Sequence, residues 1–168
     1  MEIRAEQPED AGGVWRVNEL AFGRPDEADL VARLTARGAV TLSLVAVEAG
    51  EIVGHVFFTP MTVEDGGQTT PAVGLGPVAV LPDRQGGGIG TQLITAGLEA
   101  CRVQGAKAAF VLGHPDYYPR FGFVPSTRYA IRSTYDVPED VFMAMELQPG
   151  GLAGVQGVAR YQPEFDGV

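Results

Sequence analysis

The sequence contains a single cysteine, Cys101, and no long hydrophobic run. One cysteine excludes an internal disulfide framework and a cysteine-rich zinc site, and its position in a helical pattern predicts a buried, unreactive thiol. No apolar stretch reaches the roughly eighteen residues that a membrane span needs. The first residues, MEIRAEQPED, lack the basic start and the apolar core of a secretory signal. We therefore expect a cytoplasmic protein with no membrane partner.

Basic residues are also scarce, with 12 Lys and Arg against 21 Asp and Glu, which gives a net charge of −9. This balance argues against a nucleic-acid partner, because phosphates require a basic face. It suits a small cationic substrate, or it serves solubility alone. The length of 168 residues and the hydrophobic content of 45% predict one domain over residues 1–168, in which 126–168 form C-terminal strands and a tail.

Hydrophobic periodicity predicts an α/β chain with a mixed sheet and helices on its faces. Helices are expected over Pro8–Phe22, Asp26–Arg37 and about Gly88–Gln104, with a helical turn that breaks at Gly122. Strands are expected at 2–5, 41–48, 51–63, 72–80, 108–113, just after Gly122, at 141–147 and at 155–161. Ala49-Gly50 predicts a tight hairpin and residues 64–71 a loop.

The predicted elements have inner faces and one irregularity. The expected inner residues of the helices are Val14, Val17, Leu20 and Ala21, then Leu30, Val31 and Leu34, then Ile89, Leu93, Gly97, Ala100 and Cys101. In the strand at 72–80, Gly74, Gly76 and Pro77 predict a bulge or an unpaired stretch.

Four glycines in five positions, Gly86, Gly87, Gly88 and Gly90, precede the third helix. A strand-to-helix turn that needs a positive φ would be served by one glycine. The first N–H groups of a helix have no partners inside it, and glycines let several of them converge on one ligand. The segment from Gln85 to Thr91, here called the glycine loop, is therefore predicted to bind a pyrophosphate.

Two common phosphate motifs do not fit this loop. A P-loop needs a lysine after its last glycine, and none follows Gly90. The letters of a dinucleotide fingerprint occur from Gly74 to Ala79 but continue as a strand, and a fingerprint begun at Gly86 fails at Thr91. Asp83 is the only acid nearby, so an unrelated nucleotide-binding protein is poorly supported.

The sequence resembles the GNAT N-acetyltransferases, and in particular their bacterial YhbS-like branch. Gln85, Gly88 and Gly90 fall on the family's acyl-CoA signature, Gln/Arg-x-x-Gly-x-Gly/Ala, and the run YYPRFGF matches its Tyr-x-x-x-Gly-Phe element through Tyr118, Gly122 and Phe123. The resemblance extends from the first strand to about residue 161. It implies a GNAT-like fold of α+β type, with a mixed, mostly antiparallel central sheet that is splayed between two central strands.

The resemblance also implies direct transfer of an acetyl group from the cosubstrate acetyl-CoA to a primary amine, without a metal. The implied cosubstrate contacts are the strand residues Val78, Ala79 and Val80, with the pantetheine in the gap beside Ala108–Leu112, and the loop residues Gln85, Gly86, Gly87, Gly88, Ile89, Gly90 and Thr91. The backbone N–H of Val78 would donate to the thioester oxygen as it becomes negative, a contribution of about 3 kcal/mol.

Tyr118 occupies the family's general-acid position, where a phenol of pKa ~10 would protonate a thiolate of pKa ~8.5. Without the resemblance, the sequence favours a structural role for Tyr118, as a tyrosine packed at a helix end. Tyr117 is the alternative candidate for the general acid. His114, at the end of the strand at 108–113, is the candidate base, against a purely structural role. His55 is expected to be structural.

Other features leave alternatives open. Glu51 and Asp116 are unsupported candidate bases, and the segment LGHPD lacks the asparagine that many family members carry there, so that role is not transferred. Asp26, Glu27 and Asp29 could attract a cationic acceptor or could simply favour a helix N-terminus. The alternative function is a non-catalytic acyl-CoA-binding or sensing module on the same fold. The acceptor, a small molecule or a protein, is not identified, and the family resemblance makes a homodimer an open expectation.

Overall fold

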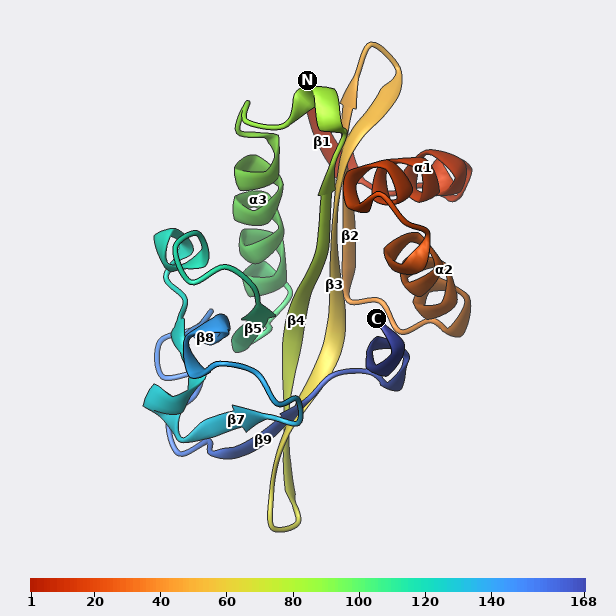
Figure 1. Ribbon diagram of the computed structural model, residues 1–168. Helices are drawn as coiled ribbons and strands as arrows, with labels where there is room; N and C mark the ends of the chain where they lie inside the picture. The colour runs from red at the N-terminus through yellow and green to blue at the C-terminus, as the bar shows by residue number, and fades with distance from the viewer. The chain divides into compact units, whose positions relative to one another are not determined.

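The computed structural model describes residues 1–168, and its helices and strands follow the predicted order closely (Figure 1). The helices are α1 (Ala11–Phe22), α2 (Asp26–Arg37) and α3 (Ile89–Val103). The strands are β1 (Glu2–Ala5), β2 (Leu42–Glu48), β3 (Glu51–Asp65), β4 (Gln68–Val80), β5 (Ala108–Leu112), β6 (Val124–Pro125), β7 (Ile131–Ser133), β8 (Phe142–Glu146) and β9 (Gly157–Arg160). Short 3-10 helices connect several of them, among them Tyr118–Phe121, Ser126–Tyr129 and Glu139–Val141.

The strands form a mixed, mostly antiparallel sheet, which confirms the predicted fold class. Only the β4/β5 and β7/β9 pairs are parallel among those whose register is defined. The chain divides into two compact units: Met1–Phe58, Gly76–Gly97 and Pro163–Val168 form the first, and Thr59–Leu75 and Leu98–Gln162 form the second. A single domain over residues 1–168 stays a prediction. None of the three helices is both long and apolar enough to cross a membrane.

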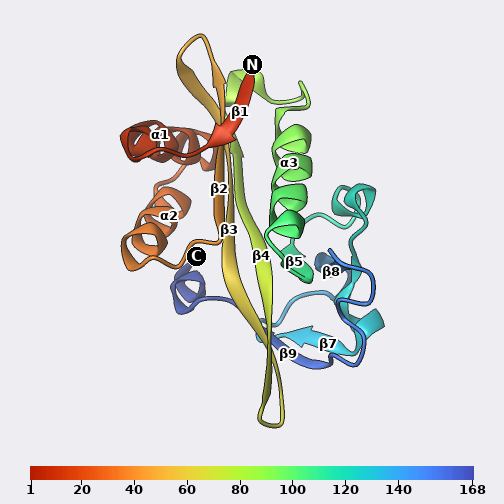
Figure 2. The ribbon, with the colours of Figure 1, turned by 180° about the vertical axis from the view of Figure 1, so that it is seen from behind.

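In the first unit, α1 and α2 pack side by side on one face of the sheet (Figures 1 and 2). The apolar residues that join them to β2 and β3 are Val14, Leu30, Val31, Leu34, Val45 and Phe57. Gly23 and Gly38 end the two helices in the left-handed conformation, at φ 69° and 76°. The prediction that Leu20 is an inner residue is wrong, because it is 42% exposed. Leu20 lies about 240° around the helix axis from Val14, and Asn18 is the buried residue on the inner face of α1 instead.

The first part of α3 covers the opposite face of the same unit, where two glycines permit a close approach. A Cβ on Gly54 of β3 would lie 2.9 Å from Ile89 Cγ2 and from Leu93 Cδ1. A Cβ on Gly97 of α3 would collide with the ring of Phe58, which is fully buried. The predicted inner face of α3 is therefore largely confirmed, and Ala100 is only half-buried.

Both hairpins of this sheet use two-residue turns. Glu48 pairs with Glu51 across Ala49 and Gly50, which have φ values of 50° and 78°, so the first predicted hairpin is confirmed. The predicted loop at 64–71 is wrong, because β3 extends to Asp65 and β4 begins at Gln68. Gly66 and Gly67, at φ 52° and 101°, make the turn by themselves, and β9 pairs with the end of β3.

In the second unit, β4 pairs with β5 only from Val73 to Leu75. Gly74 is thus paired with β5, while Gly76 (φ 133°) and Pro77 lie beyond the last β5 pair but still within β4, so the interruption is one of the pairing with β5 and begins after Leu75. β8 then pairs antiparallel with β5 and with β6. β7, which the sequence did not predict, pairs with β9.

Candidate active site

The glycine loop leaves the end of β4 and leads into α3. Gly86 and Gly88 have φ values of 83° and 86°, so two of the glycines are required by the backbone conformation. Gly87 needs no such conformation, and the nearest atom to a Cβ there would be Arg84 O at 3.6 Å. The protein therefore has room for a side chain at Gly87 and does not use it, which is consistent with the close approach of a ligand.

The start of α3 supplies N–H groups to this loop. α3 begins at Ile89, and Gln92 N donates to Gly88 O at 3.0 Å. The N–H groups of Ile89 and Gly90 therefore precede the first helical hydrogen bond and carry the positive end of the helix dipole. Residues 82–88 are exposed, so a ligand has access to them.

Two hydrogen bonds hold the loop on the sheet. Gln85 Nε2 donates to Val80 O at 3.0 Å, and Leu81 N donates to Val53 O at 2.9 Å. Along the preceding strand, Ala79 is buried and its carbonyl oxygen lies 3.4 Å from the position of a Cβ on Gly54, whereas Val78 and Val80 are half-buried. Val78, Val80 and the loop thus form one continuous, rigidly attached stretch of the first unit.

Tyr118 lies in the second unit, in the 3-10 helix that ends at Gly122 (φ 108°), as predicted. Its ring packs against Gly113, where a Cβ would collide with it, and meets the ring of Phe123 edge-on, with the ring centroids 6.0 Å apart. Burial, with a smaller contribution from Tyr117, raises the pKa of Tyr118 to about 12. The phenol therefore keeps its proton at every physiological pH.

Tyr117 has a different environment from its neighbour. The Arg120 guanidinium lies 4.3 Å from the centre of the Tyr117 ring, and Arg120 Nε donates to Tyr117 O at 2.8 Å. The amide of Tyr118 donates to His114 O at 3.3 Å, while the ring of His114 is exposed. His114 thus anchors the turn that carries Tyr118 through its backbone.

His55 is fully buried in the first unit within a chain of hydrogen bonds. Asn18 Nδ2 lies 3.1 Å from His55 Nδ1 and can only donate, so Nδ1 accepts and the ring proton is on Nε2. His55 Nε2 then donates to Ser43 Oγ at 2.8 Å, and Ser43 Oγ donates to Glu6 Oε1. Burial lowers the pKa of His55 to about 3, so the ring is neutral. These contacts agree with the structural interpretation of His55.

The remaining sequence candidates are occupied or exposed. Glu51 pairs with Arg16 at 2.7 Å, and Asp116 lies at the surface. The acids at the start of α2 pair with arginines: Asp26 and Glu27 with Arg24, and Asp29 with Arg33. These pairs favour the helix-terminus interpretation of the three acids over a cation site.

Two further findings concern inert groups. Cys101 is fully buried, and burial raises its pKa to about 12, so the predicted unreactive thiol is confirmed. No group of three or more His, Cys, Asp or Glu side chains in residues 1–168 is arranged to hold a metal ion.

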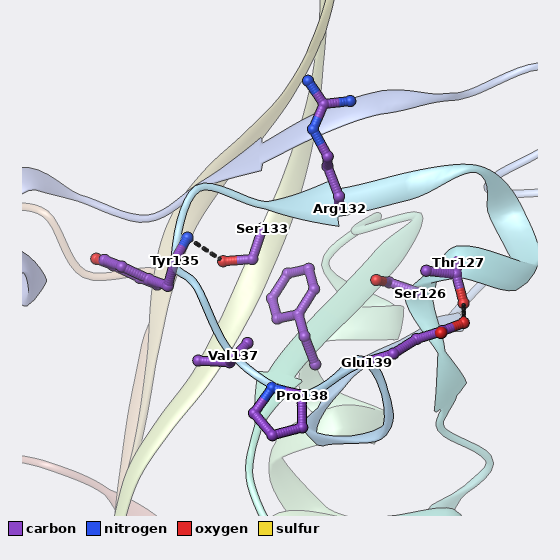
Figure 3. A pocket seen from close by; sticks show the side chains of 9 residues that line it. Ser126, Thr127, Arg132, Ser133, Tyr135, Val137, Pro138 and Glu139 are labelled. Carbon is purple, nitrogen blue, oxygen red and sulfur yellow. Dashed lines mark hydrogen bonds between the residues drawn. The ribbon is translucent and has the colours of Figure 1, made fainter.

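The second unit also contains residues that the sequence reasoning missed. A cavity lies between the 3-10 helix Ser126–Tyr129, β7 and the start of β8 (Figure 3). Beside it, the ring of Tyr135 lies 6.0 Å from that of Tyr161. The family resemblance extends to about residue 161, but no local pattern in the sequence connects Tyr161 with Tyr135.

A glycine-led helix start after a strand, and a tyrosine turn that ends at Gly122 before a short strand, are together typical of acyl-CoA-dependent acetyltransferases. The family described as "Acetyltransferase (GNAT) domain" matches residues 2–126 of the chain. The chain therefore belongs to the GNAT acetyltransferase family.

Its relatives are bacterial. It is 40% identical to the uncharacterized N-acetyltransferase YjhQ of Escherichia coli K12 over 86% of this chain and 84% of that protein. It is 35% identical to the uncharacterized N-acetyltransferase YhbS of the same strain, over 99% of both chains. The crystal structure of E. coli YhbS in complex with CoA matches with a TM-score of 0.93 and 34% identity, over 98% of this chain and 91% of that chain. A GNAT acetyltransferase from Brucella melitensis in complex with acetyl-CoA matches at 0.81 and 38%, over 98% and 97%.

Proposed function

We propose that this protein is an N-acetyltransferase that transfers the acetyl group of acetyl-CoA to a primary amine by direct attack. Family membership and the CoA and acetyl-CoA complexes of the two structural relatives support this reaction class. The observation that carries the proposal for this chain is the glycine loop. At Gly87 neither the backbone conformation nor the surrounding protein requires a glycine, so a ligand that needs the space is the simplest explanation.

In this proposal the glycine loop binds the pyrophosphate of acetyl-CoA. The N–H groups from Gln85 to Thr91 and the positive end of the α3 dipole would supply the binding energy without a cationic side chain. The hydrogen bond from Gln85 to Val80 would hold the loop in its binding conformation before the cosubstrate arrives. A pre-formed loop avoids the entropy loss of ordering a flexible segment on binding.

The end of β4 would hold the pantetheine arm and the thioester. Backbone groups of Val78 and Val80 would pair with the arm as an added strand does. The N–H of Val78 would donate to the thioester oxygen as the amine attacks, and loss of such a donor typically costs about 3 kcal/mol.

Tyr118 would donate a hydrogen bond to the CoA sulfur as the C–S bond breaks. With a pKa of about 12, full transfer to a free thiolate of pKa near 8.5 would be uphill by about 5 kcal/mol at 1.36 kcal/mol per pKa unit. The phenol therefore acts chiefly by hydrogen bonding to the developing thiolate, and the proton that the attacking amine loses completes the balance. His114 is the candidate base for that proton, because its exposed ring can pass it to water.

The test of this proposal is release of CoA thiol from acetyl-CoA in the presence of a panel of primary amines. The Tyr118→Phe variant removes only the hydroxyl, and we expect its kcat to fall by about 100-fold or more. Tyr117→Phe is the matched control, with activity close to that of the wild type. Equal activity of the wild type and Tyr118→Phe would refute the role of Tyr118. Acetyl-CoA binding without turnover of any amine would favour a sensing module.

A further inference from the structure

The cavity of the second unit has a volume of about 270 Å³. Its walls combine apolar and polar side chains, namely Ser126, Thr127, Arg132, Ser133, Tyr135, Val137, Pro138, Glu139 and Phe142. Figure 3 shows Val137 and Pro138 on one side of the cavity and the hydroxyls of Ser126 and Ser133 on the other. This is enough space for an alkyl chain with one polar end.

The carboxylate of Glu139 places a negative charge at the cavity. Glu139 Oε1 accepts a hydrogen bond from Thr127 Oγ1 at 2.6 Å, which fixes the carboxylate at the rim and leaves it further acceptor positions. Arg132 also lines the cavity, but its side chain points away from Glu139 in Figure 3. A cation is therefore favoured at the Glu139 end, in a protein whose net charge is −9.

A ring contact and a strand pair connect the cavity with the turn that carries Tyr118. Tyr135 lines the cavity, and its ring lies 6.0 Å from the ring of Tyr161. Tyr161 packs over Gly74, in the last paired stretch of β4, with Cε1 at 3.1 Å from the position of a Cβ there. The ring of Phe142, which also lines the cavity, lies 6.2 Å from that of Tyr161, and Phe142 pairs with Leu112. The next residue, Gly113, is in contact with the Tyr118 ring, so the cavity lies close to the turn that carries Tyr118. The aromatic rings that line the cavity, Tyr135 and Phe142, can stabilise a cation.

We propose that this cavity binds the distal ammonium of the acceptor through Glu139, and that the acceptor is therefore a linear diamine or polyamine. The inference rests on the proposed function. Its chemical basis is that the reacting amine must be neutral, so a carboxylate beside that same nitrogen would stabilise its unreactive form. A second amine can remain charged at Glu139 while the first attacks. The attacking nitrogen then forms the C–N bond, the C–S bond breaks, one amine proton ends on the CoA sulfur, and the distal ammonium is unchanged.

The experiment compares diamines with monoamines of equal length, namely 1,4-diaminobutane with n-butylamine and 1,8-diaminooctane with n-octylamine. Release of CoA thiol is measured for the wild type, for Glu139→Gln, and for the matched control Asp140→Asn, whose carboxylate is exposed and outside the cavity. We expect wild-type kcat/KM to favour the diamine of at least one length by about tenfold or more. Glu139→Gln should raise KM for that diamine and remove most of the preference, with KM for acetyl-CoA unchanged, whereas Asp140→Asn should behave as the wild type.

Three results would overturn the inference. One is equal use of diamine and monoamine at both lengths, and another is an unchanged preference in Glu139→Gln. The third is acetylation of another amine, such as the N-terminus of a peptide, without acetylation of any diamine, which would leave the proposed function intact. Failure of the proposed function itself is distinct, because the protein would then neither bind acetyl-CoA in a calorimeter nor release CoA with any amine.

Discussion

Burial of a neutral His55 makes the stability of the first unit depend on pH. In the folded state the pKa is about 3, against 6.5 for the free side chain, so below pH 6.5 the unfolded chain binds a proton that the folded chain does not. The free energy of unfolding must therefore fall as the pH falls. For these two pKa values, linkage gives a loss of about 2 kcal/mol between pH 7.5 and pH 5. Glu6 Oε1 lies 3.9 Å from His55 Nε2, and its negative charge favours the protonated ring, so this figure is the upper end.

Urea unfolding of the wild type and of His55→Gln at pH 7.5, 6 and 5 measures this effect. The variant loses contacts and is less stable at every pH, but it has no imidazole to titrate. We therefore expect the difference between the two proteins to shrink by up to about 2 kcal/mol on going to pH 5. Other groups titrate in both proteins, so their contributions cancel in the difference between the two free energies of unfolding. A difference that stays constant with pH would refute the inference that His55 is neutral in the fold.

Two glycines give further predictions. Gly97→Ala should lower the free energy of unfolding by about 1–3 kcal/mol in urea melts, because the new methyl group collides with the buried Phe58 ring. The control Gly12→Ala, with nothing within 4 Å of its Cβ, should be neutral or stabilising by up to about 1 kcal/mol. Equal effects of the two substitutions on the free energy of unfolding would contradict the packing of α3 against Phe58. Gly113→Ala should displace the Tyr118 ring, because the new methyl group would collide with it. We therefore expect a lower kcat at unchanged acetyl-CoA affinity in steady-state assays. An unaltered kcat would mean that the position of the Tyr118 ring does not matter for the reaction.

Much of the fold could be predicted because local signals agreed with it. α2 begins and ends at the predicted residues, since its apolar stripe, its acidic first turn and Gly38 all indicate the same bounds. The loop prediction at 64–71 failed because the composition of this segment is that of a loop. The turn needs only Gly66 and Gly67, which leaves the other residues to β3 and β4, and β9 pairs with β3 as far as Glu64. β7 was missed for the same reason, since three residues carry no periodic signal and gain their partner from β9.

The site was predictable to the extent that it is local. The glycine loop and the Tyr118 turn are contiguous motifs, and both have the backbone conformations that their glycines indicated. The chain from Asn18 through His55 to Ser43, and the cavity beside Tyr135, each join segments that are distant in sequence. No spacing rule connects such residues, so only the folded arrangement reveals them.

The central claim is that the glycine loop binds acetyl-CoA, and calorimetric titration with acetyl-CoA, CoA and ATP tests it most directly. Gly87→Leu fills the space outside the loop without straining the backbone, and Gly12→Leu places the same side chain on an exposed helical site with nothing nearby. We predict that the wild type and Gly12→Leu bind acetyl-CoA and CoA more tightly than ATP, and that Gly87→Leu, equally stable to heat, binds both CoA species at least about tenfold more weakly. Absence of binding by either CoA species, or unchanged binding by Gly87→Leu, would contradict the account.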